Sequence, residues 1–304
     1  MVKKRYNSRI KGPFLAQKVE EDLMGLELKG DFQIRKWSPS YPRDGGVSLG
    51  RSPSFLPATK SERFQSIPEL WKTHGDAEFQ ITEILDGMPM IFYEVTDSKD
   101  LYSQLPGVII EDEAENGVFP RESHGVSIGE HDYEETEASI SWKAVKEQRI
   151  ICDIRHAINI GLAGVLCGTS IAGNPLMVDG HRFYVYAMCD DFKAWKTTDD
   201  HDDEWRGQLA TLDRVPKFAT RVRLSAFAKD LDELMTKAQG ASCVSEDTRY
   251  EYPSLKRKGL AFRALDGSFS FKVIANDWLL DETEKLRKAG QDEMVSRPGP
   301  DDCI

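Results

Sequence analysis

The sequence has no apolar run that approaches the roughly 20 residues that a membrane-spanning helix needs. A secretory signal is also missing, because the basic stretch Met1–Arg9 is not followed by an apolar segment. A prenylation motif needs a cysteine four residues from the end, and Cys303 stands one residue from it. We therefore expect a protein that does not associate with a membrane.

Cysteine is scarce, with five in 304 residues, and these five lack the paired spacing of zinc ligands or of a disulfide framework. We therefore predict no metal site from the residues themselves and expect reduced thiols. Reduced thiols are typical of intracellular compartments, which predicts a cytoplasmic or nuclear location.

Basic residues are outnumbered, because 40 Lys and Arg stand against 51 Asp and Glu, for a formal net charge of -11. A protein that grips many backbone phosphates usually has a basic excess, since lysine and arginine displace the counterions of the nucleic acid. The charge therefore argues against an extended nucleic-acid interface, although it leaves room for a local basic groove.

The composition is that of a globular protein with a hydrophobic core, at 40% apolar and 30% charged residues. Glycine and proline interrupt the first part of the chain, and a Pro-Gly-Pro stretch lies near its end. We predict an N-terminal arm or cover over residues 1–50, a main domain over 51–280, and a charged helix with a flexible tail over 281–304.

Two hairpins are predicted from apolar strands that flank an Asp-Gly turn. The first covers residues 79–93 and turns at Asp86 and Gly87, and the second covers 256–280 and turns at Asp266 and Gly267.

The remaining pattern alternates between helical and strand periods. We predict the first turn of a helix at Ser61–Phe64, helices over 142–160 and 205–212, a helix from Ser225 or Ala226 to Ala238, and strands over 161–166 and 182–188.

Several motifs stand in a fixed order along the main domain. Residues 82–87 read Thr-Glu-Ile-Leu-Asp-Gly, residues 166–176 contain Leu-Cys-Gly and Gly-Asn-Pro-Leu, and residues 268–280 contain Ser-Phe-Lys-Val-Ile-Ala-Asn. This series resembles the ATP-dependent RNA ligases, which are covalent nucleotidyltransferases, over about 51–280. The resemblance implies an α+β fold, namely an RNA-ligase-type nucleotidyltransferase domain with two antiparallel sheets, flanking helices and a central groove.

The resemblance also implies a site for ATP and Mg²⁺, in which a lysine attacks the α-phosphorus and carboxylates hold the metal. Three positions depart from that pattern. Ile84 stands in place of the lysine that takes the AMP, and Val165 and Lys258 each stand in place of a glutamate. Isoleucine has no nucleophile, and a lysine would repel a divalent cation.

The positions that keep the pattern are candidates for nucleotide binding: Glu83, Asp86, Gly87, Arg121, Tyr186 (or Phe183 as the aromatic) and Lys272. Together these residue types supply carboxylates, phosphate-neutralising cations and a ring that can stack on a purine.

We interpret the chain as a pseudoenzyme: an RNA-ligase-like protein that does not adenylate itself and has a residual or repurposed pocket. It would bind a purine nucleotide, an RNA end or another protein, or its pocket would act on a small molecule. The alternative is an active RNA ligase or nucleotidyltransferase with a displaced nucleophile, for which the candidates are Lys256, Lys258 and Lys272. A third interpretation takes both Asp-Gly turns as ordinary turns of a β-core, but it does not account for the order of the motifs.

Overall fold

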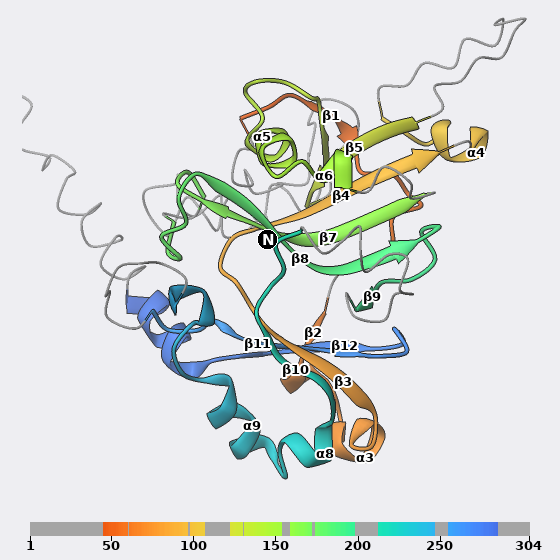
Figure 1. The fold of residues 1–304 in the computed structure, drawn as a ribbon. Helices are drawn as coiled ribbons and strands as arrows, with labels where there is room; N and C mark the ends of the chain where they lie inside the picture. Colours follow the sequence, from red (N-terminus) through yellow and green to blue (C-terminus); the bar gives the residue numbers. More distant parts are fainter. Residues whose placement is uncertain are drawn as a thin grey trace, which may run out of the picture. The chain divides into compact units, whose positions relative to one another are not determined.

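A computed structural model describes residues 45–59, 61–96, 98–106, 122–129, 131–153, 159–171, 174–197, 212–246 and 255–284. All of them belong to the compact unit Pro42–Ile304. Two β-sheets with flanking helices make up this unit (Figure 1). The predicted α+β class is therefore confirmed. No helix in the described residues is long and apolar enough to cross a membrane.

The larger sheet has seven strands in the order β1-β6-β5-β4-β7-β8-β9, and every neighbouring pair is antiparallel. Its strands are β1 (Ser48–Arg51), β4 (Met88–Thr96), β5 (Glu122–Ile128), β6 (His131–Tyr133), β7 (Ile160–Gly168), β8 (His181–Asp190) and β9 (Lys196–Thr197). The predicted strands over 161–166 and 182–188 are the central parts of β7 and β8.

The smaller sheet has five strands in the order β10-β3-β11-β12-β2. Its strands are β2 (Glu62–Arg63), β3 (Glu78–Glu83), β10 (Lys217–Arg223), β11 (Gly259–Ala264) and β12 (Ser270–Ile274). Three of its pairs are antiparallel, and the short strand β2 joins β12 in parallel.

The hairpin predicted over residues 79–93 is wrong in its pairing, although both of its strands form. Strand β3 lies in the five-stranded sheet between β10 and β11, whereas β4 lies in the seven-stranded sheet between β5 and β7 (Figure 1). The glycine of the Asp-Gly pair serves a close approach between strands. A Cβ on Gly87 would lie 2.6 Å from the carbonyl oxygen of Leu166 and 2.6 Å from Cγ1 of Val165.

The second hairpin is confirmed, because β11 and β12 pair antiparallel around the Asp266-Gly267 turn. Gly267 has a φ of 73°, a left-handed conformation that glycine adopts at no steric cost. Asp266 Oδ1 accepts hydrogen bonds from the backbone N–H of Ser268 at 3.0 Å and from its hydroxyl at 2.6 Å, which fixes the turn.

In the described part of the helix predicted over 142–160 there are two shorter helices, α5 (Ile140–Glu147) and α6 (Ile150–Asp153), and residues 154–158 lie outside the described residues. Arg149 separates them with a φ of 56°, which a continuous helix does not allow. Ser139 caps α5 by accepting a hydrogen bond from the backbone N–H of Trp142 at 3.2 Å.

The helix predicted to end at Ala238 is likewise two helices, α8 (Leu224–Phe227) and α9 (Leu231–Ala238). Asp230 begins the second of them, because its side chain accepts a hydrogen bond from the backbone N–H of Glu233 at 2.9 Å. The expected helical turn at Ser61–Phe64 is wrong, since β2 and a 3₁₀ helix, η1 (Phe64–Ser66), occupy it. Residues 205–211 of another predicted helix lie outside the described residues.

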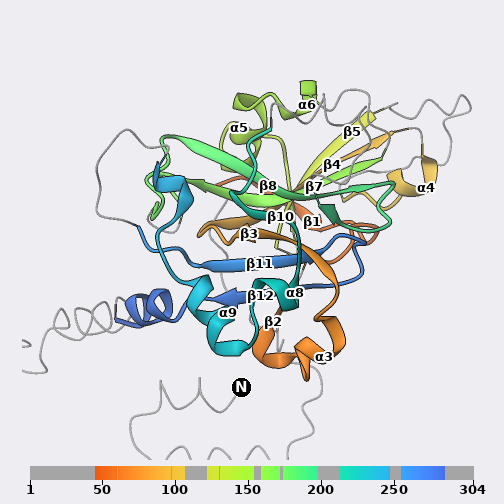
Figure 2. The same cartoon turned by 60° about the horizontal axis from the view of Figure 1, so that its bottom comes forward.

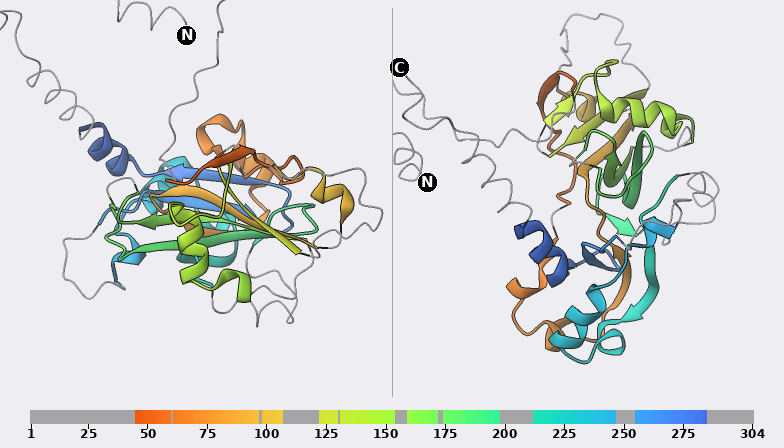
Figure 3. Two further views of the ribbon diagram at one scale, coloured as in Figure 1. Left: turned by 90° about the horizontal axis from the view of Figure 1, so that it is seen from above. Right: turned by 90° about the vertical axis from the view of Figure 1, so that its left-hand side faces the viewer.

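The other helical segments are short: α3 (Leu70–His74), α4 (Lys99–Tyr102), a 3₁₀ helix η3 (Cys243–Glu246) and residues 276–284. Figure 2 shows α3, α8 and α9 on the five-stranded sheet, and Figure 3 shows helix 276–284 (dark blue) following strand β12.

The core has separate parts for the two sheets. Helix α5 covers one face of the seven-stranded sheet, where Trp142 and Val145 belong to one buried cluster with Met90 and Phe183. Helices α8 and α9 cover one face of the five-stranded sheet. A third apolar cluster joins the segment after β3 to β7, β8 and the segments that follow them. Its buried members are Leu85, Cys167, Leu176, Val178, Val215 and Val244, and Val165, Tyr184, Tyr186 and Leu255 pack against them.

Candidate functional site

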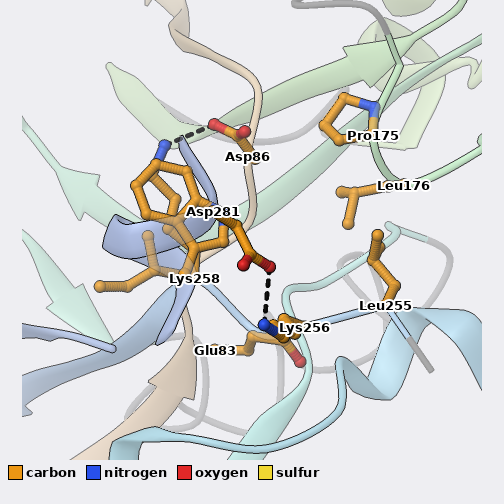
Figure 4. Close-up of a pocket in the computed structure, with 10 residues that line it drawn as sticks. Glu83, Asp86, Pro175, Leu176, Leu255, Lys256, Lys258 and Asp281 are labelled. Carbon is orange, nitrogen blue, oxygen red and sulfur yellow. Dashed lines mark hydrogen bonds and ion pairs between the residues drawn. The ribbon is translucent and has the colours of Figure 1, made fainter. Parts of the chain in front are cut away.

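A cavity of about 300 Å³ lies where the link between β3 and β4 meets the start of β11. Its walls come from four segments: the link itself, the loop after β7, residues 255–258 and helix 276–284 (Figure 4). The lining residues are Glu83, Ile84, Asp86, Pro175, Leu176, Leu255, Lys256, Lys258, Trp278 and Asp281.

An ion pair between Lys258 and Asp86 stands at this cavity (Figure 4). Nζ of Lys258 donates a hydrogen bond to Oδ1 of Asp86, and the two side chains are only 25% and 22% exposed. Such partial shielding from water strengthens their attraction. The same ammonium lies 4.5 Å from the ring centre of Trp278, a cation–π contact. Lys258 is therefore held from two sides.

Glu83 and Ile84 enter the cavity from the end of β3. The carboxylate of Glu83 is buried, and its Oε2 accepts a hydrogen bond from the backbone N–H of Cys243 at 2.9 Å. The backbone N–H of Ile84 donates to the carbonyl oxygen of Gly259 at 2.9 Å, which anchors the link to β11. At position 84 the link therefore presents an apolar side chain to the cavity.

Val165 and Cys167 lie behind Asp86 on β7, in the apolar cluster that contains Leu85. The pKa of the Cys167 thiol is raised to about 12, mostly by burial and in part by the charge of Asp86, while the charge of Lys258 acts in the opposite direction. The thiol is thus neutral near pH 7 and is a poor nucleophile.

The loop after β7 supplies two apolar walls of the cavity, Pro175 and Leu176. Asn174 shapes this loop with a φ of 50°. Its side chain accepts from the backbone N–H of Val178 at 3.0 Å and donates to the carbonyl oxygen of Val178 at 2.8 Å. The Asn-Pro pair therefore positions the cavity wall.

Cations line the neighbouring face of the five-stranded sheet. Lys272 on β12 and Arg63 on β2 are register partners. Burial lowers the pKa of Lys272, and the charges of Arg63 and Lys258 lower it further. No carboxylate among the described residues forms an ion pair with Lys272 or Arg63. These two cations are available to an anion.

Tyr186 lies on β8, beneath an arginine. The guanidinium carbon of Arg263 is 4.1 Å from the centre of the Tyr186 ring, and its Nη1 donates to Oγ1 of Thr82 at 3.2 Å. Burial raises the pKa of Tyr186, and burial lowers the pKa of Arg263. The alternative aromatic, Phe183, is buried in the core beneath α5.

The structure gathers most of the residues that the motifs predicted. Glu83, Ile84, Asp86 and Lys258 line one cavity, and Val165, Gly87 and Lys272 adjoin them. Tyr186 is not among the lining residues, and Arg121 lies outside the described residues.

The motifs missed the contribution of helix 276–284, which supplies Trp278 and Asp281. Asp281 forms an ion pair with Lys256 at 2.7 Å, and the hydrogen bond between the two side chains raises the pKa of Lys256. Trp278 and Asp281 are three residues apart and share one helical face. This three-residue spacing is the feature of the sequence that could have indicated a helical face directed at the cavity.

The residues at the cavity do not fit a divalent metal. Among the described residues no group of three His, Cys, Asp or Glu side chains is close enough to hold one. Asp86 is paired with Lys258, and one oxygen of Glu83 is bonded to a backbone N–H. Mg²⁺ in nucleotide sites is held by one or two carboxylates together with water and substrate phosphates, and here both cavity carboxylates on the β3–β4 side are already engaged.

No family model and no curated protein matches the chain. Solved structures do match it. An arginine-to-alanine mutant of the Naegleria gruberi RNA ligase with ATP and Mn has a TM-score of 0.63 and 25% identity, over 82% of this chain and 65% of that one. A lysine-to-methionine mutant with AMP and Mn has a TM-score of 0.62 and 25% identity, over 81% and 64%.

The chain spans less than two thirds of the length of these ligase structures, at 65% and 64%. Within this span the predicted resemblance to the ATP-dependent RNA ligases and the predicted nucleotidyltransferase fold are confirmed. The motif order in the sequence and the arrangement of the two sheets therefore lead to the same fold.

Proposed function

We propose that this chain, which shares the fold of the ATP-dependent RNA ligases, binds a purine nucleotide beside the Asp86–Lys258 ion pair without becoming adenylated. The observation that carries the proposal is the pairing itself, because a lysine occupies the carboxylate that a catalytic metal would need. Ile84 lines the same cavity and offers no amine to a phosphorus atom.

The replacements agree with one another. Val165 supplies no carboxylate at the cavity, and its apolar side chain packs in the neighbouring apolar cluster. A covalent nucleotidyl transfer needs a nucleophile, metal-holding carboxylates and neutralising cations at one place. The cations persist at this site, whereas the nucleophile and the carboxylate set do not.

The cavity has the size and the walls of a small-molecule pocket. Its volume of about 300 Å³ is at the lower end of the range for ligand sites. Leu176, Leu255 and Trp278 give it apolar walls for a base, and Lys258 and Lys272 supply charge for phosphates. A nucleotide or the phosphorylated end of an RNA presents this combination of groups.

A second candidate function is an active ligase with a displaced nucleophile, and one observation favours Lys272 for that role. Its amine has a lowered pKa, as an attacking lysine requires. By contrast, Lys256 is bonded to Asp281 and Lys258 to Asp86. The bound nucleotide would then have to place its α-phosphorus in line with Lys272.

The deciding experiment is incubation of the protein with α-labelled ATP and Mg²⁺ or Mn²⁺, followed by a denaturing gel and intact mass measurement. We expect no covalent AMP. An adduct that maps to Lys272 would replace the proposal with the second candidate.

A restoration variant sharpens this test. We expect Ile84→Lys combined with Val165→Glu and Lys258→Glu to gain a covalent AMP adduct, because it returns the amine and two carboxylates together. The matched control is Val165→Glu and Lys258→Glu without the lysine, which should remain unlabelled. Calorimetry with ATP, GTP and AMP tests the proposed nucleotide binding. An absence of binding heat at millimolar ligand would contradict that part of the proposal.

A further inference from the structure

The charge around the cavity has the opposite sign to the charge of the whole chain. The formal net charge of the protein is -11. Among the described residues at the cavity and on the adjoining sheet face, five cationic side chains stand near four carboxylates: Arg63, Lys256, Lys258, Arg263 and Lys272 against Glu83, Asp86, Asp277 and Asp281. A local excess of positive charge in an acidic protein favours an anionic ligand.

Lys258 is fixed in this site by its own backbone and by the preceding residue, Arg257. Arg257 is buried, and its Nε and Nη2 donate to the carbonyl oxygens of Ala238 and Lys237, each at 3.2 Å. The backbone carbonyl of Lys258 accepts from the N–H of Ala275 at 3.0 Å. The backbone at position 258 is therefore fixed, and the ammonium is fixed by Asp86 and Trp278.

We propose that the ammonium of Lys258 takes the place of a divalent metal, so that this site binds nucleotide phosphates in the absence of Mg²⁺. This inference rests on the proposed function and names the ionic form of its ligand, a metal-free nucleotide. A metal would be placed next to an ammonium and would have to compete with it for Asp86.

The donor geometry supports this assignment. A lysine ammonium has three N–H donors and no acceptor. Asp86 takes one of them, which leaves donors for phosphate oxygens. Lys272 and Arg63 add two further cations with no carboxylate partner among the described residues. Their mutual repulsion, which contributes to the lowered pKa of Lys272, is relieved when an anion binds between them.

The test is calorimetric titration of the full chain with ATP, first in EDTA and then in excess Mg²⁺. We expect ATP to bind in EDTA with an affinity that Mg²⁺ does not improve. Pyrophosphate is the second probe, because it carries the phosphates without the base and reports on the cations alone.

Two variants of Lys258 test its role, one that removes its positive charge and one that replaces it with a negative charge. Lys258→Met should weaken binding in EDTA by at least about tenfold. Lys258→Glu should abolish binding in EDTA and recover it in Mn²⁺, because a carboxylate then stands beside Asp86 and Glu83. The control is Lys146→Met. Lys146 lies on α5 and forms an exposed ion pair with Glu135 at 3.0 Å, so its loss should leave both titrations unchanged.

The outcomes separate the two proposals. If the wild-type chain binds ATP only when Mg²⁺ is present, the metal-free inference is overturned while the proposed function stands. Binding of neither ATP nor pyrophosphate under either condition overturns both. The comparison of EDTA with Mg²⁺ on the wild-type chain needs no variant, so it decides the question even where Lys258→Met fails to fold.

Discussion

The two faces of the five-stranded sheet have opposite characters, although the same strands build both. On one face Phe79, Phe262 and Phe271 are fully buried beneath α8 and α9. On the other face Arg263 and Lys272 are only partly buried. Because side chains alternate along a strand, Phe271 and Lys272 are adjacent in sequence and lie on opposite faces.

The difference separates the face that packs the core of this sheet from the face to which we assign phosphate binding. The apolar face removes aromatic surface from water, and its rings pack closely. Phe271 stacks on Phe262 with ring centres 4.5 Å apart and meets Phe79 edge-on at 5.5 Å. The cationic face keeps like charges near one another, which opposes folding and favours an anion.

The largest effect is expected for Phe271→Ala on the apolar face. Loss of a buried phenyl ring and the cavity that it leaves should lower the free energy of unfolding by about 3–5 kcal/mol. The matched change on the opposite face, Lys272→Met, should alter it by less than about 0.5 kcal/mol. Urea denaturation measures both, and equal losses would break the contrast between the faces.

A smaller effect concerns a charge in the other sheet, for which the described residues supply no ion-pair partner. Asp132 on β6 is 2% exposed and accepts hydrogen bonds from the hydroxyls of Tyr93 and Ser127. Burial raises its pKa to about 6 from 3.8, although both hydrogen bonds oppose this. The folded state therefore favours the protonated acid, whereas Asp86 has a cation partner.

The sign of the pH effect follows from this shift. The stabilising contribution of Asp132 is fully present below pH 3.8 and is lost as the pH rises through about 6. The loss is on the order of 2–3 kcal/mol. Asp132→Asn should remove this part of the pH dependence in urea titrations between pH 3.5 and about 7. An unchanged difference between the variant and the wild type across that range would contradict the prediction.

The smallest effect is a proton taken up when a nucleotide binds at the cationic face. The lowered pKa of Lys272 rises again when phosphate charge arrives beside it. Near pH 9, ATP binding should therefore take up a fraction of a proton, which calorimetry in two buffers of different ionisation enthalpy detects. Lys272→Met should abolish the uptake while Lys146→Met retains it. Equal proton uptake in the wild type and both variants would show that a group other than Lys272 takes up the proton.

Much of the candidate site could be predicted from the sequence. The order of the motifs indicated that positions 84, 86 and 258 meet, and the structure brings all three to one cavity. Alternation of apolar and polar residues in β11 and β12, with the turn at Asp266, was enough to predict a hairpin. These features depend on local periods and turn chemistry, which a sequence carries directly.

The pairing of β3 and β4 could not be predicted in this way. Both strands are local features, but each has partners far along the chain: β3 pairs with β10 and β11, and β4 with β5 and β7. An Asp-Gly pair between two strands favours a hairpin only if no other strand edge competes for them. Here burial of Leu85 and the contact of Gly87 with Leu166 direct the two strands into different sheets.

By itself the sequence determined the side chains at the site: the isoleucine at 84, the valine at 165 and the lysine at 258, and thus the absence of an amine and two carboxylates. Only the tertiary structure decided what those side chains contact. The ion pair of Lys258 with Asp86 and the cover of Trp278 join segments that are distant along the chain. Such contacts depend on which strand edges and helix faces meet, and that is settled by packing of the whole chain.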